Sequence, residues 1–246
     1  MDFYAALYPD ADRKKLRRAA WRQFKSFTTV FIDRFLIENG RHDQFKIEND
    51  GLETIVNTVK QGHGGILWMS HLGNWEVAVH CLKKYDVPIT LVLGQYADER
   101  IEAIQREQLT VGNIKIITMK EGGDFGAVEL VNALRNGELI AISGDRLFDD
   151  EQRSTNVKFF GKNCQVPIGA YVLSAITGAE IIPIYGFRQG TLSYRFVAAT
   201  PLKVQFKTRS ERQTEISRVA QACFYQLESK VKDYPDQWYN FFNYWS

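Results

Sequence analysis

The sequence predicts an α/β fold with a mostly parallel central sheet flanked by helices, preceded by an amphipathic helical segment. Short apolar runs at residues 66–69, 87–93, 114–117 and 138–143 are typical of buried strands. Segments with helical spacing of about ten or more residues separate them, which is the pattern of βαβ units. The 246 residues, 45% of them hydrophobic, can bury the core of one domain. We therefore expect a single domain over residues 1–246, with a helical segment at 1–40 and an α/β core at 41–246.

The N-terminal segment predicts one long amphipathic helix over residues 12–38, capped by Asp10 or Asp12 and ended by Gly40. Its apolar positions recur at intervals of three and four: Leu16, Ala20, Phe24, Phe27, Phe31 and Phe35. Its first half carries a basic cluster around Trp21: Arg13, Lys14, Lys15, Arg17, Arg18, Arg22 and Lys25. Such a helix fits a membrane interface with anionic head groups, and it fits equally an ordinary helix with a solvated charged face.

Further elements follow in order along the chain. We expect helices that begin at Asp50 or Gly51 and at Asn74, then at 97–109, 125–135 and 166–179, and a long one from Thr208 or Ser210. Strands at 181–187 and 192–198 flank a turn with Gly190 and predict an antiparallel hairpin. Residues 147–166 are expected to form a polar loop. The aromatic residues of 234–245 are expected to pack onto the domain.

The central stretch, residues 64–80, reads GGILWMSHLGNWEVAVH. A strand ends just before His71, and a turn at Gly73–Asn74 opens a helix whose first turn contains Glu76. Open α/β sheets bind ligands beyond the carboxyl ends of their strands. A carboxylate that holds the imidazole of His71 fixes its tautomer, so that the free nitrogen can take a proton from an alcohol. The same spacing also fits a loop histidine and a surface glutamate.

The strand at 138–143 delivers Asp145 and Arg146 to the same edge of the sheet. Asp145 can orient the imidazole, bind a substrate hydroxyl or pair with Arg146. Arg146 can hold a phosphate by a forked contact. A surface Asp-Arg turn is the alternative interpretation, but loops at strand ends are where chemistry usually resides.

The box from His71 to Glu76 resembles the His-x4-Asp/Glu box of the glycerolipid acyltransferases, and in particular of the late acyltransferases of lipid A biosynthesis. Later segments resemble that family in the same order: Phe159-Phe160-Gly161, Pro167-x-Gly169, Thr177-Gly178-Ala179, Ile182-Pro183 and Pro235-Asp236-Gln237 with its aromatic continuation. Together the boxes cover about residues 50–246.

The resemblance implies transfer of a fatty acyl group from an acyl thioester, on acyl carrier protein or coenzyme A, to a hydroxyl or amine of a lipid acceptor, without a cofactor or metal. It implies His71 as general base, Glu76 as its orienting carboxylate and Asp145 as part of a third catalytic position. N–H groups near Gly73 and Asn74 would meet the oxyanion.

Three further substrate contacts follow from the resemblance. The family uses an arginine after the second strand, for which Arg100 and Arg106 are candidates. Arg146 stands where the family often has Gln or His. Phe159 and Phe160 are either walls for the acyl chain or simply core.

The composition and the spacing of certain residues disfavour several classes of protein and of membrane attachment. The net charge of +2 does not indicate nucleic acid binding, and Cys81, Cys164 and Cys223 lack the spacing of a disulfide framework or zinc ribbon. No stretch has the length of a membrane span or the pattern of a signal peptide. In the family a membrane anchor commonly precedes this region. We therefore expect peripheral contact through residues 13–35 on the cytoplasmic side of the bacterial inner membrane.

Two alternatives remain open. One is a catalytically idle lipid-binding protein of the same fold. The other is a metal hydrolase in which Glu76 and His80, one helical turn apart, join His71 and Asp145 around zinc. The sequence has no His-Glu-x-x-His spacing, which disfavours the second alternative.

Overall fold

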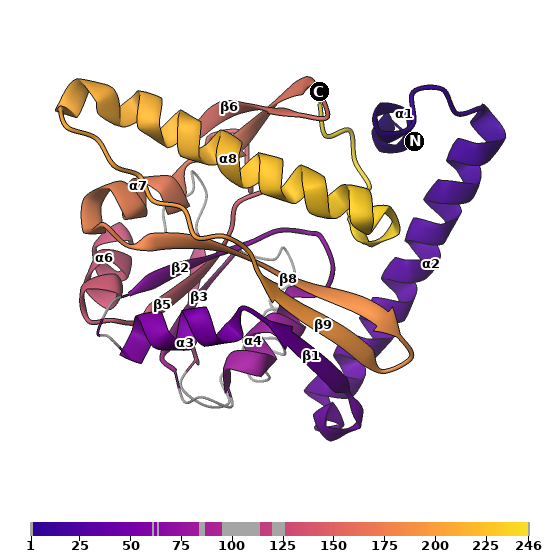
Figure 1. The fold of residues 1–246 in the computed structure, drawn as a ribbon, viewed down its shortest axis with the longest axis horizontal. Coiled ribbons are helices and arrows are strands. Elements are labelled where there is room, and N and C mark those ends of the chain that lie inside the picture. Colours follow the sequence, from indigo (N-terminus) through magenta and orange to yellow (C-terminus); the bar gives the residue numbers. More distant parts are fainter. Residues whose placement is uncertain are drawn as a thin grey trace.

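The computed structural model describes residues 2–60, 62, 64–83, 87–94, 114–119 and 126–245. Within them the central sheet has seven strands in the order β1-β9-β8-β2-β5-β3-β4 (Figure 1). Their bounds are β1 Lys46–Asp50, β2 Gly65–Met69, β3 Ile89–Gly94, β4 Ile114–Met119, β5 Leu139–Ser143, β8 Glu180–Gly190 and β9 Ser193–Ala198. Strands β8, β2, β5, β3 and β4 run parallel, and β9 pairs antiparallel with β8. The predicted α/β fold and the antiparallel hairpin are confirmed.

Helices cover both faces of the sheet (Figure 1). Their bounds are α1 Asp2–Leu7, α2 Arg13–Glu38, α3 Leu52–Lys60, α4 Trp75–Lys83, α6 Ala127–Arg135, α7 Gly169–Thr177 and α8 Arg212–Asp233, with short 3-10 turns η1 His42–Gln44, η3 Arg209–Glu211 and η4 Pro235–Gln237. Along β2, Ile66 and Trp68 point into the core beneath α6, α7 and α8, whereas Leu67 and Met69 point into the core with α3 and α4. Because both faces of β2 are covered, all five of its residues are buried and the run is apolar.

The expected polar loop at 147–166 is wrong. Residues Ser154–Phe159 and Lys162–Pro167 form a hairpin, β6 and β7, whose burial alternates along each strand. Phe160 and Gly161 have φ of 51° and 75°, as a two-residue hairpin turn requires. Since Pro167 ends β7, α7 begins at Gly169 rather than at 166. Strand β1 was not expected, and the helix expected at 97–109 lies outside the described residues.

The aromatic C-terminal tail, residues 234–245, packs onto the domain as expected. The buried ring of Trp238 lies 4.7 Å from Phe3, 5.1 Å from Phe159 and 5.0 Å from Tyr244, measured between ring centroids. Phe159 is fully buried at the centre of this cluster. The cluster ties α1, the β6–β7 hairpin and the tail together.

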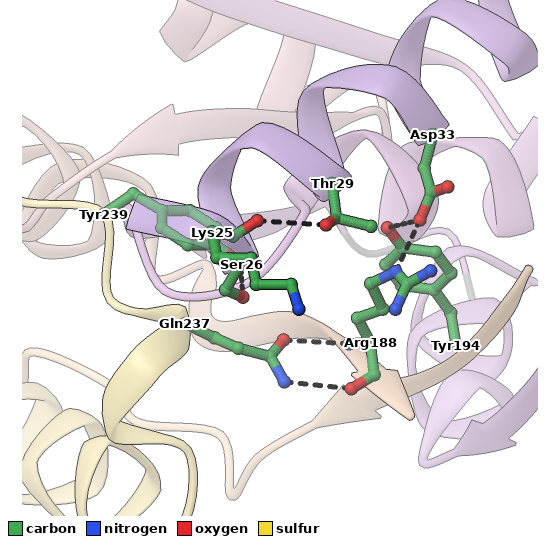
Figure 2. Close-up of polar contacts among 8 residues, drawn as sticks. All are labelled: Lys25, Ser26, Thr29, Asp33, Arg188, Tyr194, Gln237 and Tyr239. Atoms are coloured by element: carbon green, nitrogen blue, oxygen red, sulfur yellow. Dashed lines mark hydrogen bonds and ion pairs between the residues drawn. The ribbon is translucent and has the colours of Figure 1, made fainter. Parts of the chain in front are cut away.

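Helix α2 meets the rest of the protein through buried apolar side chains such as Val30 and also through polar side chains, some of which Figure 2 shows. Asp33 accepts hydrogen bonds from Arg188 Nε (2.7 Å) and from the hydroxyl of Tyr194 (2.8 Å). Ser26 Oγ lies 2.9 Å from the hydroxyl of Tyr239. The opposite side of α2 carries exposed apolar side chains, namely Trp21, Phe24, Phe31, Ile32 and Phe35. Asp12 caps the helix through Lys15 N–H, as predicted.

Within the described residues, no helix combines the length with the apolar content that crossing a membrane requires.

Replacing Phe159 with Ala should lower the free energy of unfolding by about 3–5 kcal/mol, because it removes a fully buried ring and leaves a cavity. Urea denaturation measures the change. The control is Tyr225→Ala on α8, whose side chain is 62% exposed and whose removal should cost less than about 0.5 kcal/mol. Equal stability of the two variants would contradict the central place of Phe159 in the core.

Candidate functional site

The site lies where two neighbouring parallel strands end. Met69, the last residue of β2, is paired with Ser143, the last residue of β5. The loops that follow therefore leave the sheet side by side and bring His71 next to Asp145. The Nδ1 atom of His71 lies 2.9 Å from Oδ1 of Asp145, and the backbone N–H of His71 donates to Oδ2 at 2.8 Å. Of the three roles considered for Asp145, the geometry matches orientation of the imidazole.

The carboxyl of Asp145 is completely buried, whereas the His71 side chain is 28% exposed. Burial acts to raise the pKa of Asp145, but the adjacent His71 imidazole and the hydrogen bonds from His71 outweigh it and hold this pKa below its ordinary value. An ionised Asp145 favours the proton on Nδ1, which leaves Nε2 with the free lone pair. The pair thus leaves a ring nitrogen able to accept a proton on a side chain that is partly exposed.

His71 also lines a cavity of about 200 Å³ beyond the strand ends. Most of its wall is apolar: Met69, Val92, Leu93, Met119, Leu147 and Phe148. Ser70, Ser143, Gln152 and the cationic Arg146 supply its polar positions. The arrangement places a base and a cation at an apolar slot, which suits an acyl chain whose polar end is reacting.

Glu76 lies in the first turn of α4 and is 7% exposed. Its backbone N–H donates to Oδ1 of Asn74 at 3.1 Å, so the predicted cap is confirmed. Its carboxylate is bound by Arg34 of α2, whose Nε donates to Oε2 at 2.8 Å and whose second nitrogen pairs with Oε1. The sequence predicts Glu76 as the carboxylate that orients His71, whereas the carboxylate at Nδ1 in the structure is that of Asp145. An influence of Glu76 on His71 stays a prediction.

The N–H groups of Gly73 and Asn74 themselves are already paired within the protein, so an oxyanion role for N–H groups near them stays a prediction. Gly73 N–H donates to Gln237 O at 2.8 Å, and Asn74 N–H donates to Gly186 O at 2.7 Å. Gly73 has φ of 74°, and a Cβ there would lie 2.4 Å from the Gly186 oxygen. Glycine at this position therefore permits close backbone packing against β8.

Of the remaining residues predicted to contact substrate, only Arg146 is among the described residues that line the cavity. Phe159 belongs to the aromatic core, and Phe160 packs on Phe3 with Lys232 above its ring. Neither is among the described residues that line the cavity, so a role of these two rings as walls for an acyl chain stays a prediction. Arg106 and Arg100 lie outside the described residues. Arg146 lines the cavity, with its guanidinium carbon 5.6 Å from the ring centre of Phe242.

Sequence reasoning missed the bonds that the tail makes to the site. Tyr239 N–H donates to His71 O at 2.7 Å, and the hydroxyl of Tyr244 donates to Asp145 O. The aromatic density of the tail indicated that it packs, but it carried no signal for these partners. Arg34 was missed because nothing in its own helix singles it out.

Comparisons with known proteins indicate the family to which the chain belongs. Over 141 residues the chain is 25% identical to the phosphatidylinositol mannoside acyltransferase of Mycobacterium tuberculosis, an alignment that covers 57% of this chain and 44% of that protein. Over 189 residues it is 21% identical to the protein of the same name from Mycolicibacterium smegmatis, with coverage of 76% and 59%. The chain spans about half the length of these relatives. The family model described as bacterial lipid A biosynthesis acyltransferase matches residues 7–246, so the chain belongs to this family.

Proposed function

We propose that this protein transfers a fatty acyl group from an acyl thioester to a hydroxyl or amine of a lipid acceptor. The observation that carries the proposal is the His71–Asp145 pair at the edge of a mainly apolar cavity. Family membership and the names of the mycobacterial relatives support it. Acyl carrier protein and coenzyme A are both suitable thioester donors.

The reaction follows from the pair. Nε2 of His71 removes the proton from the acceptor hydroxyl or amine as its oxygen or nitrogen attacks the thioester carbonyl. Asp145 stabilises the imidazolium that forms. When the tetrahedral intermediate collapses, the carbon–sulfur bond breaks and His71 returns the proton to the leaving thiolate. No acyl-enzyme is required.

Arg146 suits the charge that develops in this reaction. Its side chain lines the cavity that also contains His71, so its guanidinium can bind the oxyanion of the intermediate or a phosphate of a substrate. The apolar wall formed by Met69, Val92 and Phe148 would hold the acyl chain next to these groups. Arg106 remains a second candidate for the same role.

Helix α2 supports a peripheral membrane contact through residues 13–35. Its outward side is basic in the first half and aromatic in the second, with Phe31 and Phe35 each 60% exposed. Cations attract anionic head groups, and aromatic rings enter the interface. We propose that this contact is made on the cytoplasmic side of the bacterial inner membrane, where an amphiphilic acceptor would be found.

Replacing His71 with Ala should lower the rate of acyl transfer by about a hundred- to ten-thousand-fold, the range expected for loss of a general base. The assay follows transfer from an acyl thioester to lipid acceptors by mass spectrometry, with circular dichroism as the check on folding. His42→Ala removes an exposed histidine on η1 and should retain the full rate. A wild-type protein that binds lipid without turnover would instead favour the catalytically idle alternative.

Replacing Asp145 with Asn should slow transfer about a hundredfold or more, because an amide favours the wrong imidazole tautomer. It should also alter the acid response of stability. The pKa of Asp145 in the folded protein lies below its unfolded value of about 3.9, so its stabilisation is full above that pH and is lost as the pH falls through the folded pKa. The difference in Tm between wild type and Asp145→Asn should therefore narrow below about pH 4.

The matched control for this measurement is Asp10→Asn, which removes an exposed carboxylate. Its Tm should follow that of the wild type at every pH. A constant difference in Tm between wild type and Asp145→Asn down to pH 2 would contradict the ionised, paired state of Asp145.

Replacing Phe31 and Phe35 together with Ser should weaken binding to phosphatidylglycerol vesicles about tenfold, because it removes two rings from the interface. Cosedimentation measures the binding. Raising the salt concentration should weaken binding of wild type as well, since the basic half of α2 is screened. Tyr225→Ser on α8 is the control and should bind as wild type does. Unchanged binding of the double variant would remove α2 from the membrane contact.

A further inference from the structure

The ion pair between Arg34 and Glu76 joins the N-terminal helix to the site. Arg34 lies on the inward side of α2, next to Asp33, and is 26% exposed. Its Nε donates to Glu76 Oε2 at 2.8 Å, and its second nitrogen pairs with the other oxygen of that carboxylate. This forked contact binds both carboxylate oxygens at once and so fixes the orientation of the carboxylate, which the single ammonium group of a lysine cannot do in the same way.

The pair also compensates for the loss of hydration when the Glu76 carboxylate is buried. Glu76 is 7% exposed, and a carboxylate removed from water is stable only when charge and hydrogen bonds replace its hydration. The guanidinium of Arg34 supplies both. A carboxylate accepts about four hydrogen bonds in total, so the fork leaves acceptor positions for other groups.

Glu76 is mechanically linked to the loop that presents His71. Its N–H is capped by the Asn74 side chain, and Asn74 N–H in turn binds Gly186 O. Three residues before Asn74 stands His71, whose backbone N–H and ring bind Asp145. The Asn74 cap therefore fixes the backbone of Glu76 beside the site loop, and α2 binds its side chain through Arg34.

We propose that Arg34 is a positioning residue for Glu76, and that α2 is through it a part of the catalytic apparatus. This inference rests on the proposed acyl transfer. Arg34 fixes the charge and rotamer of the Glu76 carboxylate beside the His71 loop, so that loss of Arg34 affects the chemical step more than the binding of the acyl donor. Phe31 and Phe35 lie on the outward side of α2, and Arg34, between them in the sequence, lies on the inward side. One stretch of this helix therefore both faces the proposed membrane and holds the Glu76 carboxylate.

The experiment is a double-mutant cycle on kcat with Arg34→Met, Glu76→Gln and the two combined. Each single variant should lower kcat about tenfold or more while the KM for the acyl donor changes less than about threefold. The combined variant should be no slower than Glu76→Gln alone, because Arg34 acts through Glu76. Arg34→Lys keeps the charge but loses the fork, and it should recover part of the rate.

The control is Arg218→Met on α8, which breaks an exposed ion pair with Glu215 away from the site. It should leave kcat within about twofold of wild type. If Arg34→Met fails to fold, the combined variant and Arg34→Lys decide, because neither leaves Glu76 as an uncompensated buried charge.

The outcomes separate the two proposals. If wild type transfers acyl groups and His71→Ala does not, but Arg34→Met keeps the wild-type kcat, the inference is overturned and the proposed function stands. Losses of kcat that multiply in the combined variant would also overturn it. A folded wild-type protein that transfers no acyl group from either thioester donor would overturn both.

Discussion

The buried carboxylate of Asp145 is the group around which the site is built. With no exposure to water, its charge requires partners, and the structure supplies the ring and backbone N–H of His71 together with the Ser143 hydroxyl at 3.3 Å. These partners can meet it only because β2 and β5 are neighbours in register, so that both loops leave the sheet at one level. The His71–Asp145 pair lies beside the apolar wall of the cavity, so the site combines ionisable groups with a surface that suits a hydrocarbon chain.

Helix α2 shows a second use of polar contacts. Helix α2 buries the apolar residues Ala19 and Val30, as a helix on a domain surface usually does. It also buries Gln23 and Asp33, however, and leaves Phe31 and Phe35 outside. Hydrogen bonds to Tyr194, Arg188 and the tail take over part of the role that hydrophobic packing would otherwise have (Figure 2). Phe27 packs on Tyr239, but the exposed rings of Phe31 and Phe35 remain available to contact an apolar surrounding, which is consistent with the proposed membrane contact.

Local chemistry made much of the fold predictable. The Asp12 cap, the alternation of apolar runs with helical segments and the Asn74 cap each depend on neighbours in the chain, and the structure confirms them. The β6–β7 hairpin was missed because polar residues alternate with its buried ones, and a hydrophobic run is absent. The alternating pattern itself was the signal that could have revealed it.

The site was predictable as a location but not as a set of contacts. The strand ends indicated that His71 and Asp145 share an edge, yet the choice between Asp145 and Glu76 as the partner of Nδ1 depends on which strands are neighbours. The sheet places β5 between β2 and β3, out of sequence order. Arg34 comes to Glu76 across 42 positions of sequence, a distance at which pattern and propensity carry no information.

The tail has a consequence for biosynthesis. Tyr239 and Tyr244 secure the backbone oxygens of His71 and Asp145, and the second of these bonds spans 99 positions of sequence. The ribosome synthesises β2 and β5, and with them His71 and Asp145, long before it synthesises Tyr239 and Tyr244. A nascent chain can thus form its sheet while His71 and Asp145 still lack two of their hydrogen bonds, and the full set of contacts arises only after Tyr239 and Tyr244 have emerged.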